Sequence, residues 1–162
     1  MLETTDTVAA PRLHDLIITR QFDAPPALVF AAWIEPTQMA AWWGPRGFTN
    51  PLCRLDARPG GLIRIDMTGP DGAVYPMTGL FHEITPPKRL VFTTGAFPDA
   101  SGTPRLEILN IVTFVAQNDG TRLMLEASVR RSTPELAAAL GGMERGWMES
   151  LDRLTDLVVA DL

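Results

Sequence analysis

The chain has 162 residues, of which 46% are hydrophobic and 20% are charged, and its formal net charge is -5. This length favours one domain with a buried core, and the apolar content excludes a disordered chain. The acidic balance argues against a nucleic-acid binder, which needs a basic face. No apolar run is long enough to predict a transmembrane helix. The single cysteine, Cys53, excludes an internal disulfide and fits a cytoplasmic location.

The N-terminal residues are polar and lack the basic and apolar regions of a signal peptide. We expect a flexible leader over residues 1–12 and a single domain over residues 13–162. The domain begins with the segment from Leu13 to Phe22, in which apolar and polar residues alternate. This alternation predicts a first strand.

Two short helices are predicted after this strand. Asp23 is suited to cap the first helix, and Pro25 fits its first turn. The pair Glu35-Pro36 ends that helix. Thr37 is then expected to cap a second helix that ends at about Trp43.

Six further strands follow, separated by short turns except for a loose stretch from Gly95 to Pro104. The turns contain Gly, Pro and Asp-Gly pairs, which are typical of reverse turns between antiparallel strands. The expected strands are Phe48–Ala57, Leu62–Thr68, Ala73–Ile84, Leu90–Thr94, Leu106–Ala116 and Arg122–Val129. Strands joined by such short connections predict an antiparallel meander.

The C-terminal part carries one apolar stripe at helical spacing. Its members are Leu136, Leu140, Met143, Trp147, Leu151, Leu154 and Val158. The spacing predicts one continuous helix that buries this stripe against the sheet, with Trp147 pointing into the space beneath it. Gly141, Gly142 and Gly146 weaken this helix. They are expected where the backbone approaches the sheet closely or where the helix flexes to admit a guest. The expected fold class is α+β, a curved antiparallel sheet of about seven strands around a long C-terminal helix.

The sequence lacks the common catalytic motifs, including the serine-hydrolase elbow, the phosphate-binding loop and the dinucleotide fingerprint. His14 and His82 have no cysteine cluster beside them, so we expect no metal site and no cofactor. Cys53 would need a histidine base to act as a nucleophile, and a half-buried strand cysteine is the favoured interpretation. The turn Gly44-Pro45-Arg46-Gly47 could hold an anion, but a reverse turn explains the same residues.

Aromatic and methionine side chains predict the walls of an apolar pocket on the concave side of the sheet. An ordinary packed core is the alternative explanation. Asn110 interrupts an otherwise apolar strand face, and its amide needs a partner, which could be a ligand, a buried water or Glu83. The candidate ligand-binding residues are Trp33, Trp43, Tyr75, Met77, Phe81, Glu83, Phe92, Asn110, Met143 and Trp147.

Several short motifs resemble those of one known family. They include Phe22-Asp23-Ala24-Pro25, Trp42-Trp43-Gly44-Pro45-Arg46-Gly47-Phe48, Asp56-x-Arg58-Pro59-Gly60-Gly61 and Glu83-Ile84-x-Pro86-Pro87-x-Arg89-Leu90-Val91-Phe92. Over residues 13–160 the chain resembles the homologues of the activator of heat shock protein 90 ATPase, within the START-like or SRPBCC superfamily. The resemblance implies a helix-grip fold with a hydrophobic cavity between the sheet and the long helix.

Three functional hypotheses follow. The first is binding of a small hydrophobic or aromatic molecule in the cavity, without a cofactor. The second is a cyclase or hydratase-like enzyme that uses the same cavity, with Glu83, His82 or Asp66 as the general acid or base. The third, implied by the resemblance, is a co-chaperone that stimulates the ATPase of a chaperone partner. We keep a homodimer as an alternative to a monomer. Neither nucleic-acid binding nor membrane insertion is expected.

Overall fold

The computed structural model describes residues 15–160, so the predicted leader and His14 lie outside the described residues. The elements are β1 (Asp15–Phe22), α2 (Pro26–Ala31), α3 (Pro36–Trp42), β2 (Thr49–Leu55), β3 (Leu62–Thr68), β4 (Val74–Thr85), β5 (Arg89–Pro98), β6 (Pro104–Gln117), β7 (Gly120–Arg131), η1 (Pro134–Leu136), α4 (Ala137–Gly141) and α5 (Met143–Ala160). This order confirms the predicted α+β class.

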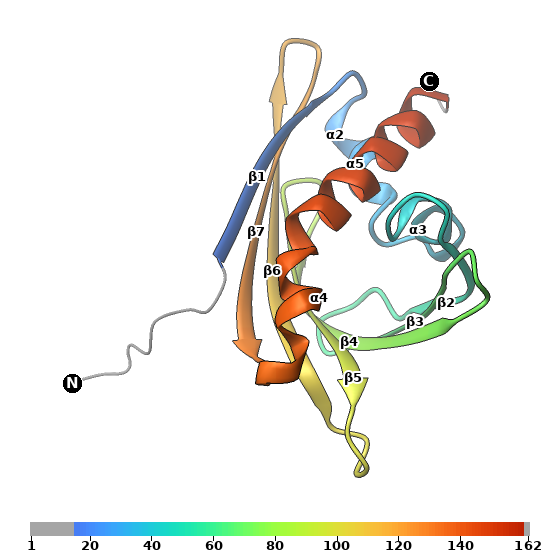
Figure 1. The fold of residues 1–162 in the computed structure, drawn as a ribbon. Helices are drawn as coiled ribbons and strands as arrows, with labels where there is room; N and C mark the ends of the chain where they lie inside the picture. Colours follow the sequence, from blue (N-terminus) through green and yellow to red (C-terminus); the bar gives the residue numbers. More distant parts are fainter. Residues whose placement is uncertain (1–14, 161–162) are drawn as a thin grey trace.

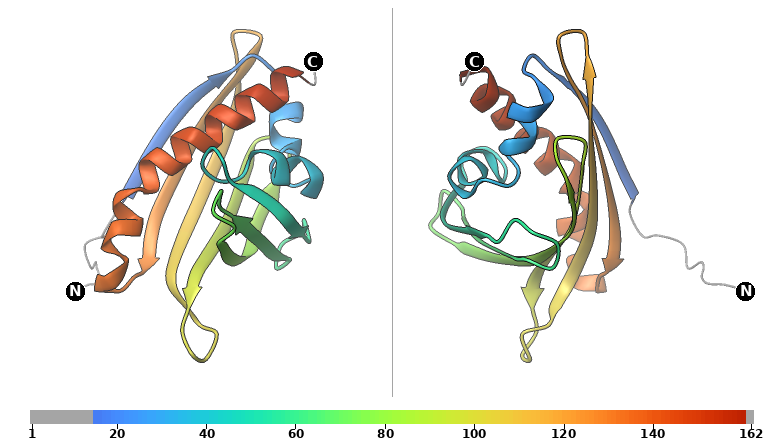
Figure 2. Two further views of the ribbon diagram at one scale, coloured as in Figure 1. Left: turned by 45° about the vertical axis from the view of Figure 1, so that its right-hand side comes forward. Right: turned by 180° about the vertical axis from the view of Figure 1, so that it is seen from behind.

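The seven strands form one antiparallel sheet in the order β1-β7-β6-β5-β4-β3-β2. Strands β2 to β7 pair with their neighbours in sequence, as the meander prediction requires. Strand β1 pairs with β7, with Ile18 opposite Leu125, and so completes the other side of the sheet. The sheet curves, and α5 lies across its concave side (Figures 1 and 2).

The hairpin between β5 and β6 is more regular than predicted. The predicted strand ended at Thr94, but β5 continues to Pro98. The carboxylate of Asp99 then accepts hydrogen bonds from the backbone N–H groups of Ser101 and Thr103, at 2.9 and 3.0 Å. This side-chain bonding closes a tight turn where the sequence predicted a loose stretch.

The two short helices lie where they were predicted, but their first residues differ. Glu35 rather than Thr37 caps α3, and its carboxylate accepts a hydrogen bond from the backbone N–H of Gln38 at 3.0 Å. Pro25 rather than Asp23 occupies the N-cap of α2, without a side-chain cap. In each helix a proline at the first helical position sets where the helix begins.

The C-terminal helix is broken near its start, contrary to the prediction of one continuous helix. The turn η1 and the short helix α4 precede α5, and Gly142 separates the two helices. A Cβ atom added at Gly141 would have no atom within 4 Å. Close approach to the sheet therefore does not explain this glycine. No helix in the described part of the chain is long and apolar enough to cross a membrane.

The buried apolar side chains form two separate clusters. The larger one packs α2, α3 and most of α5 against the sheet and contains Trp33 and Leu154. The smaller one joins α4 and η1 to the far ends of β6 and β7 through Leu106, Val129 and Leu140. Residues of both clusters line the space described next.

Candidate functional site

A cavity of about 230 Å³ lies between the concave face of the sheet and the first turns of α5. Strands β3 to β6 supply one wall, and α5 with the loop after α3 supplies the other. The lining residues are Trp43, Gly44, Pro45, Met67, Tyr75, Pro76, Met77, Thr94, Gly95, Ala96, Phe97, Leu106, Ile108, Asn110, Met143, Gly146, Trp147 and Ser150. Tyr75 is 40% exposed whereas Asn110 is 1% exposed, so the cavity leads from the surface into the core.

Small residues explain why the core leaves space here. On β5 the large side chains of Leu90 and Phe92 are followed, on the same face, by the smaller Thr94 and Ala96. On the opposite wall α5 presents Gly146, which has no side chain. Because protein cores are otherwise closely packed, this shortage of side-chain volume produces the cavity.

All four tryptophans of the chain gather at one side of the cavity. The ring centroids of Trp43 and Trp147, which line it, are 5.3 Å apart with an interplanar angle of 82°. Trp33 and Trp42 lie behind them, fully buried, with centroids 4.6 Å apart. The cavity therefore has an aromatic wall supported by a second aromatic layer.

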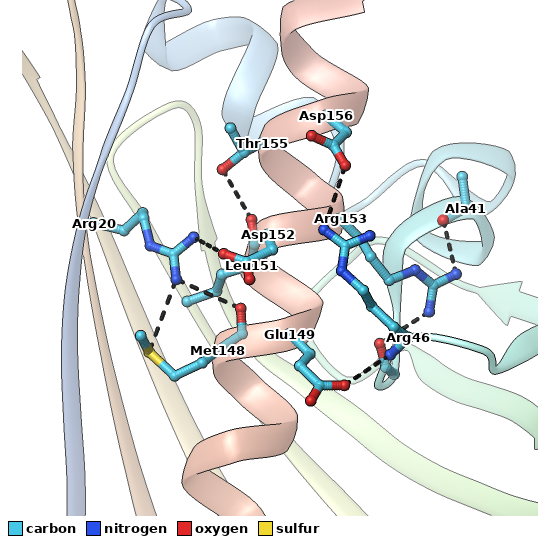
Figure 3. Close-up of polar contacts among 11 residues, drawn as sticks. Arg20, Ala41, Arg46, Met148, Glu149, Leu151, Asp152, Arg153, Thr155 and Asp156 are labelled. Carbon is cyan, nitrogen blue, oxygen red and sulfur yellow. Dashed lines mark hydrogen bonds and ion pairs between the residues drawn. The ribbon is translucent and has the colours of Figure 1, made fainter.

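Arg153 of α5 holds the loop after α3 in place. Its Nη1 donates to the carbonyl oxygens of Trp43, Gly44 and Pro45 at 3.0, 2.9 and 3.1 Å. Its Nη2 donates to that of Ala41 at 3.0 Å (Figure 3). Carbonyls at the end of a helix have no partner within it, and a cation there is also favourable. Burial lowers the pKa of Arg153. Three of these carbonyl residues line the cavity, so Arg153 positions one of its walls.

The polar groups of Arg46, in the turn Gly44–Gly47, are already paired, which argues against an anion site on this residue. The backbone N–H of Arg46 donates to Glu149 at 3.1 Å. The guanidinium of Arg46 pairs with Asp156 at 3.5 Å (Figure 3). The hydrogen bonds from the Arg46 backbone and from the side chain of Arg145 lower the pKa of Glu149. The structure therefore supports the reverse-turn interpretation.

The other side of α5 is tied to the first strand. Nη1 of Arg20 donates to the carboxylate of Asp152 at 2.7 Å, and Nη2 lies 3.5 Å from the carbonyl oxygen of Met148 (Figure 3). Helix α5 is thus held from β1 on one side and from the loop after α3 on the other. These contacts hold the helix above the cavity.

The structure brings together six of the ten candidate ligand-binding residues around the cavity. They are Trp43, Tyr75, Met77, Asn110, Met143 and Trp147. Trp33, Phe81 and Phe92 instead lie in the packed core, with exposed fractions of 0%, 1% and 2%. They support the cavity from behind.

Glu83 lies outside the cavity lining because β4 is irregular. The pairing of β4 with β5 shifts between Phe81 and Glu83, and the extra residue in between, His82, reverses the faces. The Glu83 carboxylate accepts hydrogen bonds from Nε of Arg89 at 3.1 Å and from the hydroxyl of Thr85 at 3.0 Å. Glu83 is therefore neither the partner of Asn110 nor a polar group of the cavity.

The other acid–base candidates also form contacts outside the cavity lining. Nε2 of His82 lies 3.1 Å from the hydroxyl oxygen of Thr93, on an exposed part of the sheet. Asp66 pairs with Nε of Arg64 at 2.9 Å. Of the described residues that line the cavity, none is Asp, Glu, Lys, Arg or His. Apart from the phenol of Tyr75, the lining therefore offers none of the usual general acids or bases.

Cys53 is a half-buried residue of β2 that packs against the larger cluster. Burial, together with the nearby charge of Glu35, raises its pKa to about 11. At neutral pH its thiol is protonated, which is unfavourable for a nucleophile. Within residues 15–160, no three His, Cys, Asp or Glu side chains gather in a way that could hold a metal ion.

Part of the lining was not predicted from the sequence, including Ala96, Phe97, Gly146 and Ser150. Ala96 follows Phe92 at the even spacing that places residues on one strand face, but the predicted strand ended too early. Ser150 follows Trp147 by three residues and so lies on the same helical face. The periodicity of a strand and of a helix could therefore have identified Ala96 and Ser150 as lining residues.

Asn110 is the most buried polar side chain of the cavity wall, with an exposed fraction of 1%. Its Nδ2 donates to the carbonyl oxygen of Phe92 at 3.4 Å and to the hydroxyl oxygen of Thr94 at 3.3 Å. Both distances exceed the roughly 2.7–3.2 Å of typical N–H···O bonds. Its Oδ1 is buried and has no hydrogen-bond partner.

Comparison with known families agrees with this geometry. The family described as activator of Hsp90 ATPase homolog 1-like protein matches residues 23–159. The chain belongs to this family. The resemblance drawn from its short motifs is thereby confirmed, as is the helix-grip fold that it implied.

Solved structures of bacterial proteins share the fold. A protein from Nitrosomonas europaea is 26% identical, with a TM-score of 0.77 over 91% of this chain and 95% of that chain. The AHSA1 protein from Silicibacter pomeroyi is 26% identical, with a TM-score of 0.76 over 92% and 100%. A protein from Arthrobacter aurescens is 26% identical, with a TM-score of 0.78 over 90% and 86%. No curated protein matches the chain.

Proposed function

We propose that the protein binds a small hydrophobic molecule in the cavity between the sheet and α5. The lining carries this proposal, because it combines aromatic rings, aliphatic groups and thioethers with no charged side chain among the described lining residues. Pockets for drug-sized ligands usually measure about 300–1,000 Å³. A volume of about 230 Å³ therefore favours a smaller ligand.

The chemistry of the wall supports a ligand of this kind. Trp43 and Trp147 offer large apolar surfaces, and burying apolar surface stabilises a complex by roughly 25 cal/mol per Å². Met67, Met77 and Met143 add flexible thioethers, which adapt to ligands of different shape. Since the candidate acids and bases lie outside the lining, we propose binding and no reaction.

The test uses N-phenyl-1-naphthylamine, an uncharged probe whose fluorescence rises in apolar surroundings. The blocking variant is Gly146→Leu, because a Cβ at Gly146 would lie 3.9 Å from Pro45, an ordinary contact, and the rest of the side chain would enter the cavity. Gly141→Leu is the matched control, since a Cβ at Gly141 would have no atom within 4 Å and Gly141 is not part of the lining.

We expect saturable binding of the probe to the wild type and to Gly141→Leu, and at least tenfold weaker binding to Gly146→Leu. Circular dichroism would show that all three proteins are folded. Equal binding by the two leucine variants would place the probe outside the cavity and contradict the proposal. A wild type that gives no saturable signal would also contradict it.

A further inference from the structure

Asn110 narrows the class of ligand, in a step that rests on the proposed function. We infer that the ligand is uncharged, largely apolar and equipped with one hydrogen-bond donor, such as a hydroxyl group, which pairs with Oδ1 of Asn110. A phenol or an alcohol of small size has this chemistry. Three observations carry the inference, namely the orientation of the amide, its loose hydrogen bonding and the lack of charge in the lining.

The neighbours of Asn110 determine which end of its amide is the NH₂ group and which is the oxygen. A backbone carbonyl only accepts hydrogen bonds, so the group that faces the carbonyl oxygen of Phe92 must be the NH₂ of Asn110. Turning the amide over would bring Oδ1 against that oxygen, and two acceptors repel each other. The acceptor Oδ1 is therefore the atom that is left without a partner.

An unpaired buried acceptor favours a ligand that supplies a donor. Leaving such a group unpaired is unfavourable, and a ligand donor would remove this disadvantage on binding. Oδ1 is enclosed by neighbouring atoms, so the contact needs a small rotation of the amide. The terminal torsion of asparagine is soft, and the bonds of Nδ2 at 3.3 and 3.4 Å are long. The rotation therefore costs little.

The lining also excludes a charged ligand. A carboxylate placed near Asn110 would face Oδ1 and would meet no cation among the described lining residues. A buried charge without a partner is strongly unfavourable. The other polar side-chain groups of the lining are the hydroxyl groups of Thr94, Ser150 and Tyr75 and the indole N–H groups of Trp43 and Trp147, none of which supplies a cation. The wall thus matches a neutral ligand with a single polar end.

Four probes of one shape separate these properties. In the wild type, 4-tert-butylphenol offers a donor, 4-tert-butylanisole offers only an acceptor, 4-tert-butyltoluene offers neither, and 4-tert-butylbenzoate is an anion. Each dissociation constant is measured by displacement of N-phenyl-1-naphthylamine and confirmed by calorimetry. The same series is measured with Asn110→Leu, which removes the amide and keeps a similar volume.

We expect the preference for the phenol over the toluene to fall by about 3- to 10-fold from the wild type to Asn110→Leu, the range that one neutral hydrogen bond supplies. Comparing two proteins cancels the different hydration of the two probes. The benzoate should bind weakest to the wild type. If Asn110→Leu fails to fold, Asn110→Ala replaces it in the same comparison.

The outcomes distinguish a failure of the inference about Asn110 from a failure of the proposed function. If the phenol and the anisole bind the wild type equally, or if the preference survives the loss of the amide, the inference is wrong and the proposed function stands. Tightest binding of the benzoate would likewise overturn the inference alone. If no probe binds, the proposed function fails, and the inference fails with it.

Discussion

The indole rings of Trp33 and Trp147 are stacked, with centroids 6.0 Å apart and an interplanar angle of 22°. Trp33 is fully buried in the larger core cluster, whereas Trp147 is partly exposed and lines the cavity. The stacked pair therefore marks the boundary between the packed core and the candidate ligand site. Because both residues are tryptophans, replacing each in turn compares the packed core with the cavity wall.

Trp33→Ala should lower the free energy of unfolding by about 3–5 kcal/mol, the usual cost of removing a packed tryptophan. Trp147→Ala should cost less, because one side of its ring faces the cavity and loses few contacts. It should also weaken binding of N-phenyl-1-naphthylamine. Urea denaturation of both variants checks the first part, and equal losses of stability would make Trp147 an ordinary core residue.

Arg153→Met should lower the free energy of unfolding by about 1–3 kcal/mol, because it leaves the carbonyl groups of Trp43, Gly44 and Pro45 without their charged donor. Arg145→Met is the matched control on the same helix. Arg145 is exposed and, among residues 15–160, forms an ion pair only with Glu149, four residues away, so its loss should cost less than about 0.5 kcal/mol. Chemical denaturation measures both. Similar values for the two variants would show that Arg153 does not hold the loop.

Much of the fold follows from the sequence because its signals are local. Turns with Gly and Asp-Gly pairs separate the strands of the meander, and the apolar stripe of α5 keeps helical spacing from Met143 to Val158. The break before α5 was not predicted, because the stripe continues across it through Leu140. Periodicity detects a face, but it does not detect whether the backbone hydrogen bonds along it are continuous.

The site was predicted less completely because its lining depends on register and volume. One extra residue in β4 turns Glu83 away from the cavity lining, and composition gives no warning of such a bulge. Phe92 and Thr94 lie on the same face of β5, yet only the smaller Thr94 lines the cavity. This difference depends on which residue of α5 lies opposite, here Gly146. The local sequence does not reveal which residues of the sheet and of α5 face each other.

The stability of the protein should depend on pH through Glu149. The pKa of Glu149 in the folded protein lies below its ordinary value of 4.5, so this residue stabilises the fold above that pH. The contribution should be lost as the pH falls below 4.5 toward the folded pKa, because the unfolded chain then binds more protons. Urea denaturation at several pH values should show a shallower acid dependence for Glu149→Gln. Identical profiles would contradict this role.

The thiol of Cys53 should react slowly in the folded protein. Its pKa is about 11 instead of 9.0, so at pH 8 the thiolate fraction is roughly a hundredfold lower than in the unfolded chain. The rate of reaction with a disulfide reagent, measured with and without urea, checks this expectation. The rate for the folded protein should rise as the pH approaches 11. Equal rates in both conditions at pH 8 would mean that burial does not protect the thiol.

Gly141→Ala should raise the free energy of unfolding by about 0.5–1 kcal/mol, because alanine is favoured over glycine in a helix and a Cβ there would meet no atom within 4 Å. Gly79→Ala should instead destabilise the protein strongly. A Cβ at Gly79 would clash with the backbone carbonyl oxygen of Thr93 on the neighbouring strand, which cannot move without disturbing the sheet. Urea denaturation of the two variants gives the comparison. A loss of stability in Gly141→Ala would show that the chain needs a glycine at the end of α4, as a flexible link before α5.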